Sequence, residues 1–241
     1  LVLTSPIPRR FYSISSPSGS SSLTLSIGVV DDERPGHLEN YHGLASYAIG
    51  TRTASTSPEE GGAPSSSSIV ASIATSSFRL PTELYTSSIV LIAGGTGIAP
   101  MRAFLAELEG MGLCGQRGHQ VLVYFGCRNE DEYLYREFLE RLVETRVIAH
   151  LRVAMSRQPG VRKQYVQDLL KEDLDRIHDQ YMNRNAHFYV CGGAKTIGVG
   201  ARSALETMFA QKGKNVDGEG ASASVTQLMA DGRFQLDVWG N

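Results

Sequence analysis

One stretch of the sequence combines the residues that chemistry at a phosphate group requires. Residues Ile89 to Ala93 are apolar, Gly94, Gly95 and Gly97 follow, and a helical pattern opens at Ala99–Pro100. Glycines let backbone N–H groups approach a ligand closely, and the first turn of a helix carries partial positive charge. The stretch therefore predicts a strand, a turn and a helix start that bind phosphate, although a purely structural tight turn is the alternative because GxGxxG is absent.

Several other chemistries lack support in the composition and motifs. The net charge of −2 and the pI near 6.3 give no electrostatic case for nucleic acid. The six histidines show no metal-ligand spacing, so no metal site is predicted, and the absence of GxSxG argues against a hydrolase. Three sparse cysteines are typical of reduced thiols and favour a cytoplasmic location. No apolar run of about 18 residues is present, so no membrane segment is expected.

The second part of the chain alternates between two kinds of pattern. Short apolar runs predict strands at 89–93, 120–125, 148–154, 187–191 and 234–238. Helical patterns lie between them at 99–112, 131–145, 164–171, 173–182, 196–211 and 223–231. Buried strands separated by helices imply an α/β fold, a doubly wound five-stranded parallel sheet covered on both faces. Ligands of such sheets bind at the carboxyl ends of the strands.

The first part of the chain has a different pattern. Alternating apolar residues around 9–15 and 23–30 predict antiparallel strands, and small residues after Gly43 predict a short helix that begins near Leu44. Residues 51–68 are rich in Ser, Thr, Gly and Pro and are predicted to be a flexible loop. We therefore expect two domains, a partial antiparallel β-barrel over 1–81 and a nucleotide-binding domain over 89–241. Because few barrel strands can be counted and the chain begins with Leu1, we expect a fragment of a longer protein.

Six short motifs occur in order along the chain: Arg10-Phe11-Tyr12-Ser13, Gly43-Leu44-Ala45-Ser46, Gly95-Thr96-Gly97-Ile98-Ala99-Pro100, Tyr124-Phe125-Gly126-Cys127-Arg128, Tyr189-Val190-Cys191-Gly192 and Asp237-Val238-Trp239. The series resembles the FAD/NADPH-binding half of the diflavin reductases, a module of the ferredoxin–NADP reductase type. It is most similar to NADPH–cytochrome P450 reductases and to the reductase portion of self-sufficient P450 monooxygenases. The resemblance covers nearly the whole chain apart from residues 51–68.

The resemblance implies an FAD site in the first domain. Arg10 would pair with the FAD pyrophosphate, Phe11 belongs to the same motif, and Tyr12 would pack on the flavin ring. Ser13 would hydrogen-bond near flavin N5. Residues Gly43, Leu44, Ala45 and Ser46 would hold the FAD phosphates through backbone N–H groups and the Ser46 hydroxyl, although an ordinary helix cap is the alternative.

The resemblance also implies an NADPH site in the second domain. Gly95, Thr96 and Gly97 would hold the NADPH pyrophosphate, and Arg128 would neutralise phosphate unless it forms a surface salt bridge. A 2′-phosphate needs several cationic or hydroxyl donors around one point. The candidates are Ser156, Arg157, Lys163, Tyr165 and Gln167. An NAD site usually places an acidic residue there, so NADPH is favoured over NADH; a basic solvent-exposed face is the alternative.

Four residues would serve hydride transfer by the same resemblance. Cys191 and Asp237 would assist it together with Ser13, and Trp239 would cover the flavin face opposite Tyr12. Gly193 stands where an acidic residue is usual, which would weaken placement of the nicotinamide.

The implied activity is hydride transfer from NADPH to FAD, with onward electron delivery through an FMN-binding module to a P450 haem module. FMN and haem are expected only on those modules, which this chain lacks. The alternative is a non-enzymatic NADPH-binding module that does not retain FAD.

Overall fold

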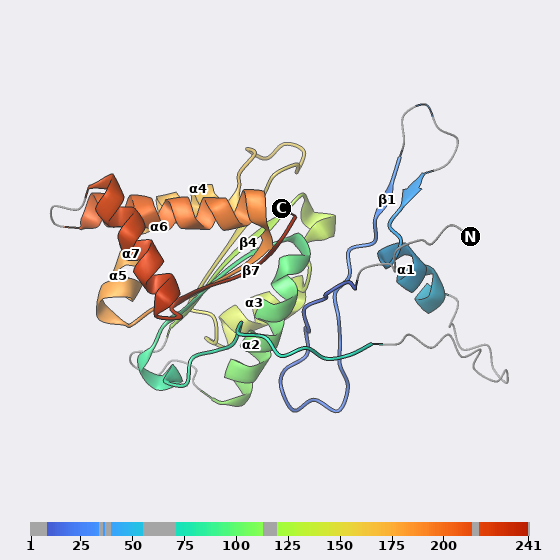
Figure 1. The fold of residues 1–241 in the computed structure, drawn as a ribbon, viewed down its shortest axis with the longest axis horizontal. Coiled ribbons are helices and arrows are strands. Elements are labelled where there is room, and N and C mark those ends of the chain that lie inside the picture. The colour runs from blue at the N-terminus through green and yellow to red at the C-terminus, as the bar shows by residue number, and fades with distance from the viewer. Residues whose placement is uncertain are drawn as a thin grey trace, which may run out of the picture. The chain divides into compact units, whose positions relative to one another are not determined.

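A computed structural model describes residues 9–33, 36, 40–54, 71–112, 120–213 and 217–240 (Figure 1). The chain forms two compact units, and each is described here by itself. The small unit comprises Leu1–Tyr12 and Ser26–Ser76, and the sheet unit comprises Ser13–Leu25 and Ser77–Asn241. The predicted domain limits at 81 and 89 stay a prediction.

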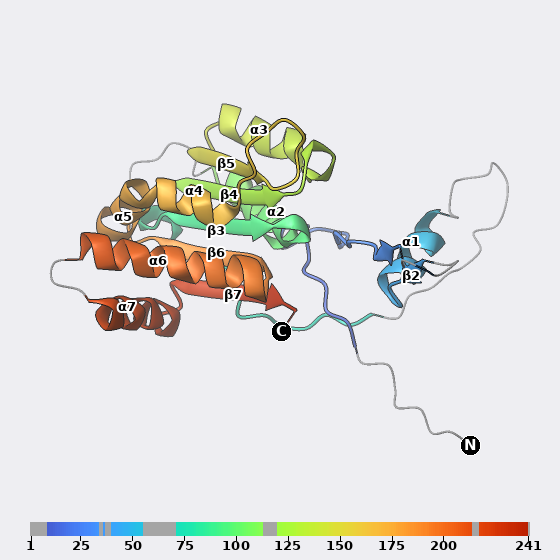
Figure 2. The same ribbon diagram turned by 90° about the horizontal axis from the view of Figure 1, so that it is seen from above.

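The sheet unit is built on five parallel strands in the order β5-β4-β3-β6-β7 (Figure 2). They are β3 (Ile89–Gly94), β4 (Val121–Cys127), β5 (His150–Met155), β6 (His187–Gly193) and β7 (Phe234–Trp239). The predicted α/β fold class is thereby confirmed, and a small antiparallel sheet precedes this one in the chain. The five strand predictions agree with the structure to within two residues at each end, and the central strands β3, β4 and β6 are almost continuously apolar because they are buried on both faces.

Helices cover both faces of this sheet (Figure 1). One face carries α2 (Ile98–Gly110) and α3 (Arg136–Glu144). The other carries α4 (Val166–Glu172), α5 (Leu174–Asn183), α6 (Val199–Lys212) and α7 (Gly218–Ala230). Side chains of β3 alternate between the two cores, since Val90 and Ile92 pack on one face and Leu91 on the other. Burying such a side chain contributes about 1.5–3 kcal/mol.

Three helix predictions differ from the structure in ways that local geometry explains. The helix predicted over 131–145 is a 3₁₀ turn η3 (Glu130–Glu132) and then α3, because Tyr135 between them is left-handed with φ 57°. The helix predicted to start at 196 is a π-helical turn η4 (Ala194–Gly198) followed by α6. Helix α7 begins five residues before its predicted start at 223, because the Asp217 side chain accepts from Gly220 N at 2.8 Å and caps it.

The segment Ser13–Leu25 pairs with itself inside the sheet unit. Ile14 and Leu25 form one antiparallel bridge, and Ser15 N donates to Thr24 O at 2.8 Å. The sheet unit also contains the 3₁₀ turns η1 (Leu84–Thr86) and η2 (Gly95–Gly97). The predicted antiparallel pairing of residues 9–15 with 23–30 is therefore shorter than its sequence pattern suggests.

The small unit contains an antiparallel pair, β1 (Asp31–Asp32) and β2 (Tyr41–His42), and helix α1 (Ser46–Ala54). The helix predicted near Leu44 begins two residues later. Residues 51–54 continue that helix instead of opening the predicted loop, and Thr51 Oγ1 donates to Tyr47 O at 3.0 Å within it. Residues 55–68 lie outside the described residues. Over the described ranges, the helices are too short or too polar to cross a membrane.

Candidate functional site

The glycine-rich turn leads from the buried strand β3 into α2. Gly95 adopts φ 56°, a left-handed conformation that glycine adopts without strain, and the 3₁₀ turn η2 runs into α2. No side chain caps η2 or the start of α2, and the N–H of Ile98, the first residue of α2, bonds to the carbonyl groups of Gly95 and Thr96. A glycine turn that leads from a strand into a helix can bind phosphate, and the phosphate site expected from the sequence stays a prediction. Gly95, Thr96 and Gly97 all lie in this turn.

Gly97 brings the turn against the end of β6. A Cβ added to Gly97 would overlap the carbonyl group of Cys191, so only glycine allows this approach. Strand β3 pairs with β4 on one side and with β6 on the other, and the chain leaves it for β4 before returning to β6. Strand order reverses there, which is where ligands of open parallel sheets bind.

Three of the predicted catalytic residues meet at this end of the sheet. Cys191 on β6 lies directly beside Asp237 on β7 in the strand register. Ser13 Oγ donates to Asp237 Oδ2 at 2.7 Å, and Cys191 Sγ lies 3.7 Å from the same oxygen. The structure thus brings Ser13, Cys191 and Asp237 together from widely separated parts of the sequence.

The charge state of this group follows from its burial. Cys191 is fully buried, and burial, followed by the nearby Asp237 carboxylate, raises the pKa of its thiol. At neutral pH the thiol therefore keeps its proton and donates weakly to Asp237. Asp237 accepts from both neighbours, which fits a positioning and electrostatic role and gives no support to covalent chemistry at Cys191.

Trp239 ends the same strand two residues after Asp237, so their side chains share one face of β7. It is 46% exposed and lies opposite Gly193 in the strand register. A large aromatic side chain half open to solvent at the ligand end of a sheet can cover a flat ligand. Tyr12, which would cover the opposite flavin face, belongs to the small unit, so that stacking arrangement stays a prediction.

The ends of β4 and β5 bring further predicted residues side by side. Ser156 N donates to Cys127 O at 3.1 Å, and Arg157 N donates to Arg128 O at 2.6 Å. These bonds continue the strand pairing beyond both strands. The guanidinium of Arg128 pairs with Glu132 at 3.4 Å while both side chains are well exposed. The surface salt bridge considered for Arg128 is therefore present, and such a pair is weak enough for phosphate to compete with it.

The remaining candidates stand at the start of α4. Lys163 Nζ lies 5.2 Å from the ring centre of Tyr165, and Gln167 lies in the first turn of α4. Arg157, Lys163 and Tyr165 are exposed, so their donors are open to a ligand. Exposed cationic and hydroxyl donors of this kind can bind phosphate groups, and the assignment of these residues to a 2′-phosphate stays a prediction.

The predicted FAD-binding residues lie in the small unit, apart from Ser13. Ser46 is buried, and its Oγ accepts from Val30 N at 3.2 Å. Gly43 N donates to Val30 O at 2.8 Å, so the Gly43–Ser46 turn is held against the strand before it. Arg10 is exposed and Phe11 is 83% exposed. The roles of these residues, and of Tyr12, Leu44 and Ala45, stay predictions.

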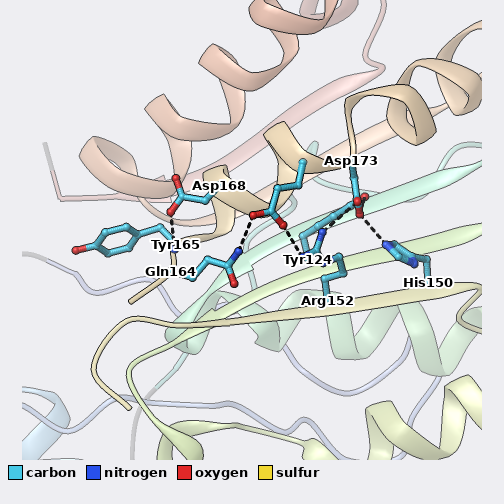
Figure 3. A network of polar contacts seen from close by, with 8 residues as sticks. Tyr124, His150, Arg152, Gln164, Tyr165, Asp168 and Asp173 are labelled. Carbon is cyan, nitrogen blue, oxygen red and sulfur yellow. Dashed lines mark hydrogen bonds and ion pairs between the residues drawn. The ribbon is translucent and has the colours of Figure 1, made fainter. Parts of the chain in front are cut away.

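The sequence did not predict two groups of residues that contact the segments carrying the candidate site. Arg102 on α2 donates to Ser15 O at 2.7 Å, close to Ser13 in the chain, and its guanidinium lies 5.2 Å from the Tyr135 ring centre. A second group joins β4, β5 and the junction of α4 and α5 (Figure 3). Its members are Tyr124, His150, Arg152, Gln164, Glu172 and Asp173. Each has an ordinary residue type for its position, so no sequence signal marks it.

Sequence comparison shows that the chain is similar to known oxidoreductases. Residues 91–199 match the model of the oxidoreductase NAD-binding domain family. The chain is 32% identical over 231 residues to NADPH–cytochrome P450 reductase of Mus musculus, covering 95% of the chain and 33% of that protein. The same-named protein of Dictyostelium discoideum is 31% identical over 242 residues, covering 99% and 34%.

A third relative, NADPH–cytochrome P450 reductase of Drosophila melanogaster, is 37% identical over 165 residues, which is 68% of the chain and 24% of that protein. The chain thus spans about a third or less of the length of the curated relatives it matches. The resemblance stated from the six motifs is confirmed.

Proposed function

Residues 91–199 belong to the oxidoreductase NAD-binding domain family, and we propose that the chain transfers hydride from NADPH to FAD, as the FAD/NADPH part of a cytochrome P450 reductase-type flavoprotein. One observation carries the proposal. The side chains of Ser13 and Cys191 both contact one carboxylate oxygen of Asp237, at the carboxyl end of the sheet and beside the glycine turn. That convergence has no evident structural purpose, since ordinary apolar residues would close the end of the sheet as well.

The nucleotide is proposed to lie along the ends of β3, β4 and β5. The N–H groups of Gly95, Thr96 and Gly97 hold its pyrophosphate, and Arg128 adds positive charge. Ser156, Arg157, Lys163, Tyr165 and Gln167 bind the 2′-phosphate and thereby select NADPH over NADH. Forked guanidinium and hydroxyl donors suit a phosphate with three oxygens.

When bound, NADPH supplies a hydride and FAD accepts it. The chain's own residues orient the reacting groups and exclude water. Asp237 fixes the orientation of the Ser13 hydroxyl by accepting its hydrogen bond. The Cys191 thiol packs beside them in its neutral form. Trp239 would cover the flavin face and would have to move aside to admit the nicotinamide. The FAD is held by two segments. They are Arg10, Phe11 and Tyr12, and the turn formed by Gly43, Leu44, Ala45 and Ser46.

We propose that the electrons then pass through an FMN-binding module to a P450 haem module, which hold FMN and haem. The support for these partners is homology to proteins named NADPH–cytochrome P450 reductase. The domain limits of 1–81 and 89–241 belong to the same proposal.

The absorption spectrum of the purified chain tests the proposal. A flavin band at ~450 nm that bleaches when NADPH is added under nitrogen, and bleaches far less with NADH at the same concentration, is the expected result. Reconstitution with added FAD precedes the measurement, so that loss of flavin during purification does not decide it.

A second candidate function rests on the exposure of apolar side chains in the small unit. Phe11 is 83% exposed and Ile73 is 74% exposed, and among the described residues of this unit no apolar side chain is buried that would help to order a flavin site. The candidate is a non-enzymatic module that binds NADPH without retaining FAD. A chain that stays colourless after reconstitution with FAD but still binds NADPH would identify it.

A further inference from the structure

The loop between β5 and α4 carries most of the residues proposed for the 2′-phosphate, and it is exposed. Arg157 and Lys163 stand on its surface, and Tyr165 ends it. Long exposed cations bind an anion weakly when they must be ordered at the moment of binding, because each loses rotamer freedom. Selectivity for the 2′-phosphate therefore depends on the contacts that hold this loop in its conformation before the nucleotide binds.

One carboxylate holds the last part of the loop. Glu172, at the end of α4, accepts from Gln164 Nε2 at 3.0 Å through Oε1 and from Arg152 Nη2 at 2.7 Å through Oε2. Gln164 lies between Lys163 and Tyr165 in the chain, and its backbone N donates to Met155 O at 3.2 Å. The side chain and the backbone of Gln164 are thus both fixed, and its two neighbours are fixed with it.

The other end of this chain of contacts is anchored in the sheet (Figure 3). Arg152 Nη1 donates to Asp173 Oδ1 at 3.0 Å. The second Asp173 oxygen accepts from the hydroxyl of the buried Tyr124 at 3.0 Å and lies 2.7 Å from His150 Nε2. Burial acts to raise the pKa of the Asp173 carboxyl, but these hydrogen bonds and the Arg152 charge outweigh it and lower that pKa. Asp173 is therefore charged at neutral pH and is held by three side chains.

Close packing fixes the first turn of α4 as well. A Cβ at Gly126 would lie 2.6 Å from Val166 Cγ2, and a Cβ at Gly200 would lie 3.0 Å from Gln167 Cβ. The Asp168 carboxylate accepts from Tyr165 N at 2.9 Å. The first turn of α4 cannot shift without breaking these contacts, so Glu172 joins the exposed loop to a rigid helix.

We propose that Glu172, paired with Arg152, is a positioning residue for nucleotide selectivity: it orders Gln164 so that Lys163 and Tyr165 face a 2′-phosphate before the nucleotide arrives. The inference rests on the proposed NADPH site. Glu172 is 49% exposed and contributes no donor to the phosphate, so its effect on binding passes through Gln164. A carboxylate that acted on the phosphate directly would repel it, and its removal would tighten binding.

Calorimetric titration with adenosine 2′,5′-bisphosphate tests this, because that probe carries the 2′-phosphate but neither nicotinamide nor flavin. Glu172→Ala is expected to weaken its binding about fivefold to tenfold, from the lost ordering of two side chains. Adenosine 5′-monophosphate, which lacks the 2′-phosphate, is expected to bind both proteins equally. Glu172→Gln keeps an acceptor for Arg152 and is expected to restore binding to within about twofold.

Two further variants make the result specific. Gln164→Ala removes only the loop side of the bridge and is expected to weaken the bisphosphate about threefold while Arg152 stays paired. Glu144→Ala removes the same charge from the exposed end of α3 and is the matched control for net charge, with unchanged binding expected.

The possible results distinguish the positioning role of Glu172 from the proposed NADPH site on which it rests. Unchanged or tighter binding of the bisphosphate to Glu172→Ala would overturn the positioning role, as would an equal loss for both probes. A Glu172→Gln variant as weak as Glu172→Ala would also overturn it. Failure of the unsubstituted chain to bind the bisphosphate would instead overturn the proposed NADPH site.

Discussion

The two units of the chain differ in how they hold their candidate residues. In the sheet unit, strands β3, β4 and β6 are almost fully buried between two layers of helices, and the predicted residues follow the ends of these strands. Among the described residues of the small unit, Ser46 alone is buried, and its strands are two residues long. A pair of such short strands is marginal by itself.

Short ligand-binding motifs of the same kind can therefore be attached either to a well-packed core or to segments with little buried surface. The residues proposed to bind the nucleotide are positioned by strands that are buried in a hydrophobic core. In the small unit Arg10 is exposed, and the Gly43–Ser46 turn is held by hydrogen bonds to Val30. Rigid elements position ligand-binding groups more accurately than loops do, so we expect the sheet unit to bind its nucleotide in a form close to the one described here.

The largest expected contrast is in the free energy of unfolding. Leu91→Ala removes a fully buried side chain from the centre of the sheet and is expected to cost about 2–5 kcal/mol. Ile73→Ala, at a position 74% exposed in the small unit, is expected to change stability by less than ~0.5 kcal/mol. Urea unfolding followed by circular dichroism measures both, and similar losses would remove the contrast between the units.

The next effect concerns the close contact at the site. Gly97→Ala forces a methyl group against the carbonyl of Cys191 and is expected to cost about 1–3 kcal/mol, with weaker NADPH binding because the turn shifts. Gly110→Ala, at the open end of the same helix, meets nothing within 4 Å and is the control. It is expected to stabilise the protein slightly. Equal changes in stability for Gly97→Ala and Gly110→Ala would show that the contact between Gly97 and the Cys191 carbonyl is not tight.

A smaller effect is expected for the direct phosphate contact. Arg157→Ala should raise the KM for NADPH about tenfold and leave that for NADH nearly unchanged, because a charged hydrogen bond to the 2′-phosphate is lost. Arg162→Ala in the same loop is the matched control. Steady-state kinetics with ferricyanide as electron acceptor measure both. Equal increases for NADPH and NADH would contradict the selectivity assigned to Arg157.

The smallest effect is a pH dependence from the start of β6. Burial, and then the charge of Arg233, lowers the pKa of His187 from its usual 6.5 to about 4. Between these values the unfolded chain binds a proton that the folded protein excludes, so stability falls as the pH drops from 6.5 towards 4. His187→Gln should make this fall shallower in urea unfolding at pH 7, 6 and 5. Parallel curves would contradict the assignment.

The strands of the sheet unit could be predicted because burial on two faces leaves a continuous apolar run such as that of β3. The site could be predicted only in part. The meeting of Ser13 with Asp237 followed from the resemblance alone, since no spacing rule joins residues so far apart. The bridge from Gln164 through Glu172 to Arg152 escaped prediction because charged residues near helix ends are ordinary, and only tertiary folding decides which of them pair.

The hydrogen bond from Ser13 to Asp237 joins residues 224 positions apart. On a ribosome that adds 5–20 residues per second, Asp237 follows Ser13 by about 10–45 s. During that interval the earlier strands can pair, but Ser13 has no acceptor and the end of the sheet lacks its edge strand. The contact between Ser13 and Asp237 therefore forms only after the last of the five strands, β7, has been synthesised.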